Sequence, residues 1–186
     1  MRITNPPSIT LPQLAAMAAC ARNRVAQLYL HWTAGRYGEY YDDYHLNIDA
    51  DGTVYCTCTE LQQYKAHTWQ RNSGSIGIAL CCGLGAQANS GSDADLGDFA
   101  PTAAQIDKLA QVVALLSCKL GLPLTAAAVM THCEAAFSDG YGPYSGDVET
   151  RWDLWYVRDS PGDGVMRPGG QVLRGKALWY LSRQRR

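Results

Sequence analysis

The segment RVAQLYLHWTAG, residues 24–35, combines a short apolar run with a histidine near its end. β-Branched and aromatic residues in such a run favour a strand, which we predict over Val25–Trp32. The Ala34–Gly35 pair that follows favours a turn. A strand in this position can hold the His31 imidazole rigidly at the edge of a sheet, where it can act as a ligand. We therefore expect later segments to supply this histidine with partners.

Predicted strands and helices alternate along the rest of the chain. Apolar runs predict further strands, and apolar residues at helical spacing predict helices. The expected strands are 44–48, 53–58, 75–82 and 126–131, and the expected helices are 10–23, 102–120 and 170–183. Asp51-Gly52 is a strong hairpin signal between the first two of these strands. Without a repeat or linker, this pattern predicts one α/β domain over residues 1–186, a sheet covered by helices.

Composition argues against several classes of protein. The 186 residues carry a formal net charge of −1, so no overall field favours a nucleic acid partner. No stretch approaches the ~20 apolar residues that span a bilayer, so we expect no membrane insertion. The N-terminal MRITNPPSITLPQ lacks the features of a signal peptide, and we expect synthesis and folding in the cytoplasm. The seven cysteines, an odd number mostly within apolar segments, are interpreted as reduced thiols.

Two of the four histidines, His31 and His132, each close a predicted strand. A single histidine in such a place is more often a structural residue than a ligand. Two of them at strand ends favour a shared site, although their spacing alone does not show that they meet.

Five local motifs follow one another in a characteristic order. They are His31-Trp-Thr33, Tyr44-His45 before Asp51-Gly52, Ala66-His67 before Asn72, Ser75-Ile-Gly-Ile78, and Thr131-His132 before Arg151-Trp-Asp153. As an ordered set they resemble the zinc-dependent N-acetylmuramoyl-L-alanine amidases of the type-2 amidase and peptidoglycan recognition protein superfamily, which includes phage endolysins. The resemblance spans about residues 25–157. It implies a central, mostly mixed β-sheet flanked by helices, with one Zn²⁺ in a surface groove and peptidoglycan or muropeptides as partner.

Carried over to this sequence, the resemblance assigns three zinc ligands. His31 and His132 would be the first two, and Asp153 in Arg151-Trp-Asp153 fits the third. Asp153 lies farther from His132 than is usual in the family, and the glycine-rich segment 139–147 looks like an insertion that accounts for this. Two histidines and a carboxylate would leave a fourth position for water, as in catalytic zinc sites. The rival third ligands are Cys133, Glu134, Asp139 and Asp147.

The resemblance also implies roles around the metal. Tyr44 matches the family's catalytic tyrosine, which would orient the water or donate a hydrogen bond to the tetrahedral intermediate. Arg151 stands where the family has an oxyanion-stabilising lysine. Glu134 is a candidate proton acceptor, although a capping or solvated glutamate is the simpler interpretation. His67 and Thr33 are expected to contact substrate.

The function implied is hydrolysis of the amide between N-acetylmuramic acid and L-alanine, either for cell-wall lysis or for muropeptide recycling. Some members carry a glutamate where this chain has Ala79. The alternative is a non-catalytic peptidoglycan recognition module, as some superfamily members are. We expect a monomer.

Overall fold

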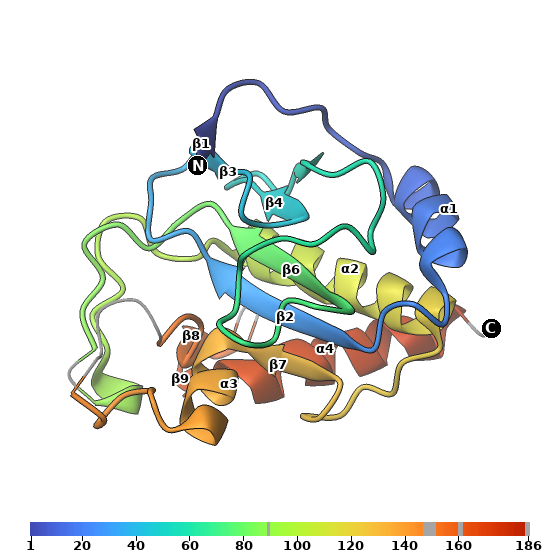
Figure 1. Cartoon of the computed structure of the whole chain (residues 1–186). Coiled ribbons are helices and arrows are strands. Elements are labelled where there is room, and N and C mark those ends of the chain that lie inside the picture. The colour runs from blue at the N-terminus through green and yellow to red at the C-terminus, as the bar shows by residue number, and fades with distance from the viewer. Residues whose placement is uncertain (89, 147–151, 160–161, 185–186) are drawn as a thin grey trace.

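A five-stranded sheet forms the centre of the protein, whose computed structural model describes all residues except 89, 147–151, 160–161 and 185–186. The strand order is β5-β4-β6-β2-β7 (Figure 1). The inner pairs are parallel and β5 runs antiparallel to β4, so the sheet is mixed, as expected. Its strands are β2 (Gln27–Trp32), β4 (Leu46–Ile48), β5 (Val54–Cys56), β6 (Ser75–Leu80) and β7 (Val129–Thr131).

Helices α2 and α4 pack side by side behind these strands in Figure 1, and α1 packs against α2. The α/β class is therefore confirmed. The helices are α1 (Leu11–Ala21), α2 (Ala103–Leu120), α3 (His132–Asp139) and α4 (Gly169–Gln184). Two short strand pairs complete the fold, β1 (Arg2–Ile3) with β3 (Tyr40–Tyr41) and β8 (Tyr156–Arg158) with β9 (Met166–Pro168), together with a 3₁₀ turn at Gly91–Asp93. No helix within the described ranges has the length and apolar character needed to cross a membrane.

The start of α2 is tied to the sheet by its own cap. Thr102 and Gln105 form a reciprocal capping box, which satisfies backbone N–H groups that the first turn leaves free. The buried Gln105 amide also donates to the carbonyl oxygens of Ile48, at 3.0 Å, and Cys81, at 3.2 Å. These bonds fix the helix against the ends of β4 and β6.

The two faces of the β2–β6 pair differ in chemistry. Successive side chains on a strand point to opposite faces. The alternate residues Leu28, Leu30, Ile76 and Ile78 join the apolar core under the helices. The intervening residues face the other way, and there His31 on β2 lies in register with Ala79 on β6. This second face carries the candidate site.

The segment between β5 and β6 covers this second face (Figure 1). Within it, the imidazole of His67 packs directly on Gly77 of β6. A Cβ atom at Gly77 would lie 2.4 Å from His67 Cγ, closer than side-chain atoms approach one another. Glycine is therefore required at this position by the close approach of the ring.

We expect Gly77→Ala to push the His67 ring from its place and to lower the free energy of unfolding by about 1–3 kcal/mol through overpacking. Chemical denaturation measures this. Gly175→Ala is the matched control, because a Cβ there meets open space on helix α4. It should raise stability by as much as about 1 kcal/mol through helix propensity. Equal stability of Gly77→Ala and the native protein would contradict the packing argument.

Candidate metal centre

Three side chains from separate parts of the chain converge on one point. The Asp153 Oδ2 atom lies 3.3 Å from Nδ1 of His31 and 3.3 Å from Nδ1 of His132. The three potential ligand atoms all lie within 4.8 Å of one another. Two imidazole nitrogens and one carboxylate oxygen form a ligand set used by catalytic zinc sites. The cluster is therefore chemically suited to hold a metal ion.

His132 reaches the cluster as the first residue of helix α3, which the sequence did not predict. The Thr131 hydroxyl accepts a hydrogen bond from the Glu134 backbone N–H, so the chain turns from β7 directly into the helix. The backbone N–H of Cys133, in the first turn, donates to the Asp153 carbonyl oxygen at 3.4 Å. The helix start thus holds one ligand and fixes the backbone of another.

Asp153 is held between two buried apolar neighbours. Trp152 packs edge-to-face on Trp32 of β2, with ring centroids 4.7 Å apart. Leu154 is fully buried and has a left-handed φ of 57°, a conformation that costs about 1–2 kcal/mol for such a residue. The backbone N–H of Trp155 donates to the Trp152 carbonyl oxygen at 3.0 Å and closes the turn. Packing on both sides therefore maintains a strained turn that presents the carboxylate.

The cluster combines the Asp153 carboxylate with a His31 imidazole that is neutral at ordinary pH. Burial acts to raise the pKa of Asp153, but the His132 charge and hydrogen bonds from both histidines outweigh it and bring the pKa to about 2. Burial lowers the pKa of His31 to about 4, in spite of its bond to Asp153. The neutral form of the His31 ring is the form that can bind a metal.

A cavity of about 270 Å³ opens onto the cluster. Tyr44 forms part of its wall, and its ring centroid lies 5.1 Å from that of His31. Burial, followed by the negative charge of Asp153, raises the pKa of the Tyr44 phenol, so the hydroxyl keeps its proton. The lining residues are Trp32, Thr33, Ala34, Tyr44, Trp69, His132 and Asp153.

Residues 10–145 match the model of the Amidase_2 family, described as N-acetylmuramoyl-L-alanine amidase. The chain belongs to this family. The match includes His31 and His132 and ends before Asp153, so it carries no information about the third ligand. Among solved structures, the chain is similar to PGRP-Hd from Alvinella pompejana, with 16% identity and a TM-score of 0.38, over 70% of this chain and 79% of that chain. No curated protein sequence matches it significantly.

The family expected from the motifs is thus confirmed, and the structure brings several of the expected residues to the cluster and its cavity. Thr33 and Tyr44 line the cavity. Arg151 lies outside the described residues, as does Asp147, one of the rival ligands. Two other rivals are engaged elsewhere: Cys133 is buried in the apolar core, and Asp139 forms an ion pair with Arg71.

Glu134, the candidate proton acceptor, lies outside the cluster and is paired elsewhere. Its carboxylate accepts a hydrogen bond from the Thr131 backbone N–H at 3.0 Å and two from the Arg174 guanidinium, each of 2.8 Å. A Cβ atom at Gly170 would lie 2.2 Å from Glu134 Oε1, so the side chain is pressed against α4. Glu134 therefore caps α3 and joins it to α4.

His67 is likewise placed differently from the expectation that it contacts substrate. Its side chain is buried, with a relative exposure of 6%, and does not line the cavity. The centroid of its ring lies 5.5 Å from that of His31. Asp153 contacts Nδ1 of His31, whereas Thr68, the neighbour of His67, contacts the other ring nitrogen, Nε2. The residue supports the site from behind.

Trp69 and Thr68 are site residues that the sequence reasoning missed. Trp69 lines the cavity and keeps 61% of its surface exposed. Thr68 contacts Nε2 of His31 at 3.2 Å. Both residues directly follow the Ala66-His67 motif, and this adjacency was the sequence feature that could have identified them as site residues. Their side-chain directions depend on how the covering segment folds.

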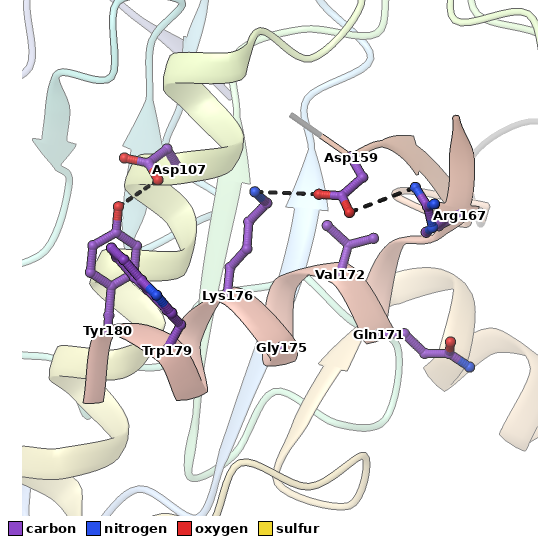
Figure 2. Close-up of a pocket in the computed structure, with 9 residues that line it drawn as sticks. All are labelled: Asp107, Asp159, Arg167, Gln171, Val172, Gly175, Lys176, Trp179 and Tyr180. Atoms are coloured by element: carbon purple, nitrogen blue, oxygen red, sulfur yellow. Dashed lines mark hydrogen bonds and ion pairs between the residues drawn. The ribbon is translucent and has the colours of Figure 1, made fainter. Parts of the chain in front are cut away.

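A larger cavity of about 710 Å³ lies along α4 (Figure 2). Its charged groups are paired: Asp159 lies 3.3 Å from Lys176 Nζ and 3.7 Å from an Arg167 nitrogen, and Tyr180 donates to Asp107 at 2.5 Å. None of its described lining residues is a histidine or cysteine, the others being Gln171, Val172, Gly175 and Trp179. The metal-ligating side chains gather at the smaller cavity.

We expect the metal-free protein to lose stability as the pH falls from about 7.5 to 5. Burial lowers the pKa of His31 and His45 to about 4 and of His67 to about 2. In the unfolded chain these groups titrate near ~6.5. Below that pH these histidines bind protons in the unfolded state but not in the folded state. This lowers the free energy of unfolding by up to about 2 kcal/mol per histidine at pH 5.

Urea unfolding in the presence of a chelator measures this dependence. A His45→Gln variant should show a shallower fall between the same pH values, because one of the three contributions is gone. A free energy of unfolding that stays constant from pH 7.5 to 5 would contradict the burial of neutral histidines.

Proposed function

We propose that this amidase family member is a zinc-dependent N-acetylmuramoyl-L-alanine amidase. It would hydrolyse the amide that joins the lactyl group of N-acetylmuramic acid to L-alanine, in peptidoglycan or in muropeptides released from it. The observation that supports this proposal is the convergence of His31, His132 and Asp153 beside an open cavity. Family membership supplies the substrate class.

The three clustered side chains would hold the zinc ion. When bound, zinc supplies Lewis-acid polarisation of the amide carbonyl and activation of a water molecule for attack. The imidazoles would hold it through their Nδ1 atoms, which face Asp153. His31 is fully buried and His132 is partly exposed on the cavity side, so substrate approaches past His132.

Tyr44 would act as a hydrogen-bond donor toward the reacting carbonyl. Its raised pKa keeps the phenol protonated, and among the described residues its hydroxyl makes a long 3.5 Å contact to the Trp32 carbonyl oxygen. A donor that is weakly engaged in the free protein can turn to the oxygen on which negative charge develops. The exposed Trp69 ring and Thr33 form the remaining walls against which sugar or peptide would pack.

A digest of purified peptidoglycan, with and without chelator, tests the proposal. We expect new L-alanine amino termini to appear in the digest, as detected by mass spectrometry, and the chelator to prevent their appearance. Asp153→Ala should abolish turnover and bound zinc, because it removes the carboxylate ligand. Asp163→Ala is the matched control, since this carboxylate is exposed on the β8–β9 hairpin and pairs with Arg167. Retention of zinc and turnover by Asp153→Ala would refute the ligand assignment.

Binding of peptidoglycan without release of stem peptides, in protein that contains zinc, would refute the enzymatic proposal. It would instead identify a recognition module.

We further expect Tyr44→Phe to lower kcat by about 10²–10³-fold, the usual cost of removing an oxyanion donor, while zinc content stays unchanged. The phenyl ring keeps the packing on His31 and removes the hydroxyl alone. Tyr144→Phe serves as control because this side chain is 74% exposed and does not line the cavity. Kinetics on a soluble muramyl peptide measure both variants. An unchanged kcat in Tyr44→Phe would exclude the donor role.

A further inference from the structure

We propose that Cys56 and Cys58 form a reactive dithiol, a modification site at which a peroxide oxidises the two thiols to a disulfide bond. The pair lies where strand β5 ends, in the wall of a cavity of its own. None of the residues that line this cavity lines the cavity at the metal cluster. The dithiol is therefore a second site, and its chemistry does not depend on the metal.

The extended chain brings the two thiols together. Residues two apart on a strand point to the same side of it. The Sγ atoms of Cys56 and Cys58 lie 3.6 Å apart, and Cys56 Sγ lies 3.2 Å from the Cys58 carbonyl oxygen. In a disulfide bond the sulfurs are ~2.05 Å apart, so they must approach by about 1.5 Å. The side chains thus lie close to bonding distance, and closing the bond bends the chain between them.

Both thiols are reached from one cavity of about 330 Å³. A water molecule takes up ~30 Å³ in the liquid, so hydrogen peroxide, which is only slightly larger, has room to enter. The lining residues are Ile3, Pro6, Pro7, Cys56, Thr57, Cys58, Thr59 and Gln63. None of these side chains is charged, and the two thiols are the oxidisable groups among them.

The surroundings of Cys56 favour its thiolate. A hydrogen bond from the Cys58 thiol lowers the pKa of Cys56, and the positive charge of Lys65 acts in the same direction, whereas burial opposes both. The hydrogen bond to Cys56 and burial raise the pKa of Cys58, so this thiol keeps its proton. Because a thiolate is the nucleophile in thiol oxidation, Cys56 is the sulfur that attacks the peroxide and Cys58 the sulfur that resolves.

The oxidation balances with a peroxide as the oxidant. The Cys56 thiolate attacks one oxygen of hydrogen peroxide, the O–O bond breaks, and a sulfenic acid and hydroxide form. The hydroxide becomes water with the proton that Cys56 released. The Cys58 sulfur then attacks the Cys56 sulfur and displaces its hydroxyl group, which leaves as water with the Cys58 proton. In all, the two thiols lose two electrons and two protons, and the peroxide is reduced to two water molecules.

Thr57, the residue between the cysteines, is hydrogen-bonded on both sides. Its backbone N–H donates to the His45 carbonyl oxygen at 3.0 Å, and its hydroxyl donates to the Tyr44 carbonyl oxygen. The Thr57 carbonyl oxygen accepts a hydrogen bond from Nζ of the buried Lys65 at 2.7 Å. A bend at Thr57 therefore acts on the backbone of Tyr44, whose side chain lines the cavity at the metal cluster. We expect oxidation to lower turnover by this path, a consequence that rests on the proposed function.

Peptide mass spectrometry of the native protein after exposure to hydrogen peroxide tests the site. Trypsin cleaves after lysine and arginine, so residues 37–65 form one peptide that contains Cys56, Cys58 and no other cysteine. We expect this peptide to lose two hydrogen atoms, to resist alkylation and to regain both thiols with dithiothreitol. The exposed Cys118, alone in its peptide, is the internal control and should stay open to alkylation at the same dose. Alkylation of both Cys56 and Cys58 after a dose that oxidises Cys118 would overturn the proposal.

Cys58→Ser tests the division of roles between the two sulfurs. Serine keeps a hydrogen-bond donor of similar size and removes the resolving thiol. Peroxide should then add oxygen to Cys56, as a sulfenic or sulfinic acid, without loss of hydrogen from the peptide. The matched control Cys118→Ser should form the disulfide as the native protein does. An unmodified Cys56 in the Cys58→Ser variant would overturn its role as the attacking sulfur.

Turnover of a soluble muramyl peptide separates this inference from the proposed function. In protein shown to carry the disulfide, we expect kcat to fall severalfold and to recover with dithiothreitol. Zinc content should stay unchanged, because none of the proposed ligands is a thiol. An unchanged kcat in the oxidised protein would overturn the path from Thr57 to Tyr44. A disulfide that forms in protein without amidase turnover would refute the proposed function and leave the dithiol site standing.

Discussion

The Asp153 carboxylate, buried between two imidazole rings, is the interaction on which the site depends. A carboxylate removed from water is stable only with compensating partners, and here His31 and His132 provide them. The same contacts draw together strand β2, the start of α3 and the turn before β8. The strained backbone of Leu154 is tolerated because Trp152 and Leu154 pack on either side of that turn. Apolar packing thus secures a polar cluster that would not assemble alone.

The β2–β6 pair meets two demands at once. One face supplies aliphatic side chains to the core, while the other carries His31, Ser75 and Gly77 beneath the covering segment. Buried polar groups on that second face must be hydrogen-bonded, and the His67 segment provides the partners. The segment between β5 and β6 therefore covers this face of the sheet and contacts His31 with the same residues. Changes in it should consequently affect stability and metal binding together.

Much of this could be predicted from the sequence, because strand patterns and ordered motifs are local signals. The strand ending near His31 follows from the local pattern, whereas the mixed sheet and the grouping of His31, His132 and Asp153 were implied by the resemblance of the ordered motifs to the amidase family. Side-chain directions could not be predicted. Glu134 turns to Arg174, forty residues later, and His67 turns inward because Gly77 leaves room. Helix α3 was missed because Thr131, read as the end of a strand, is also a helix cap.

The electrostatic balance of the cluster follows from which partners are neutral. Ala79, in register with His31, offers no carboxylate, and the outer partner of His31 is the Thr68 hydroxyl. Within the described residues at the cluster, Asp153 therefore supplies the single negative charge. A divalent ion held by such a set keeps a net positive charge, whereas a second carboxylate would neutralise it. Because negative charge develops on the carbonyl oxygen during amide hydrolysis, this residual positive charge favours the reaction that we propose.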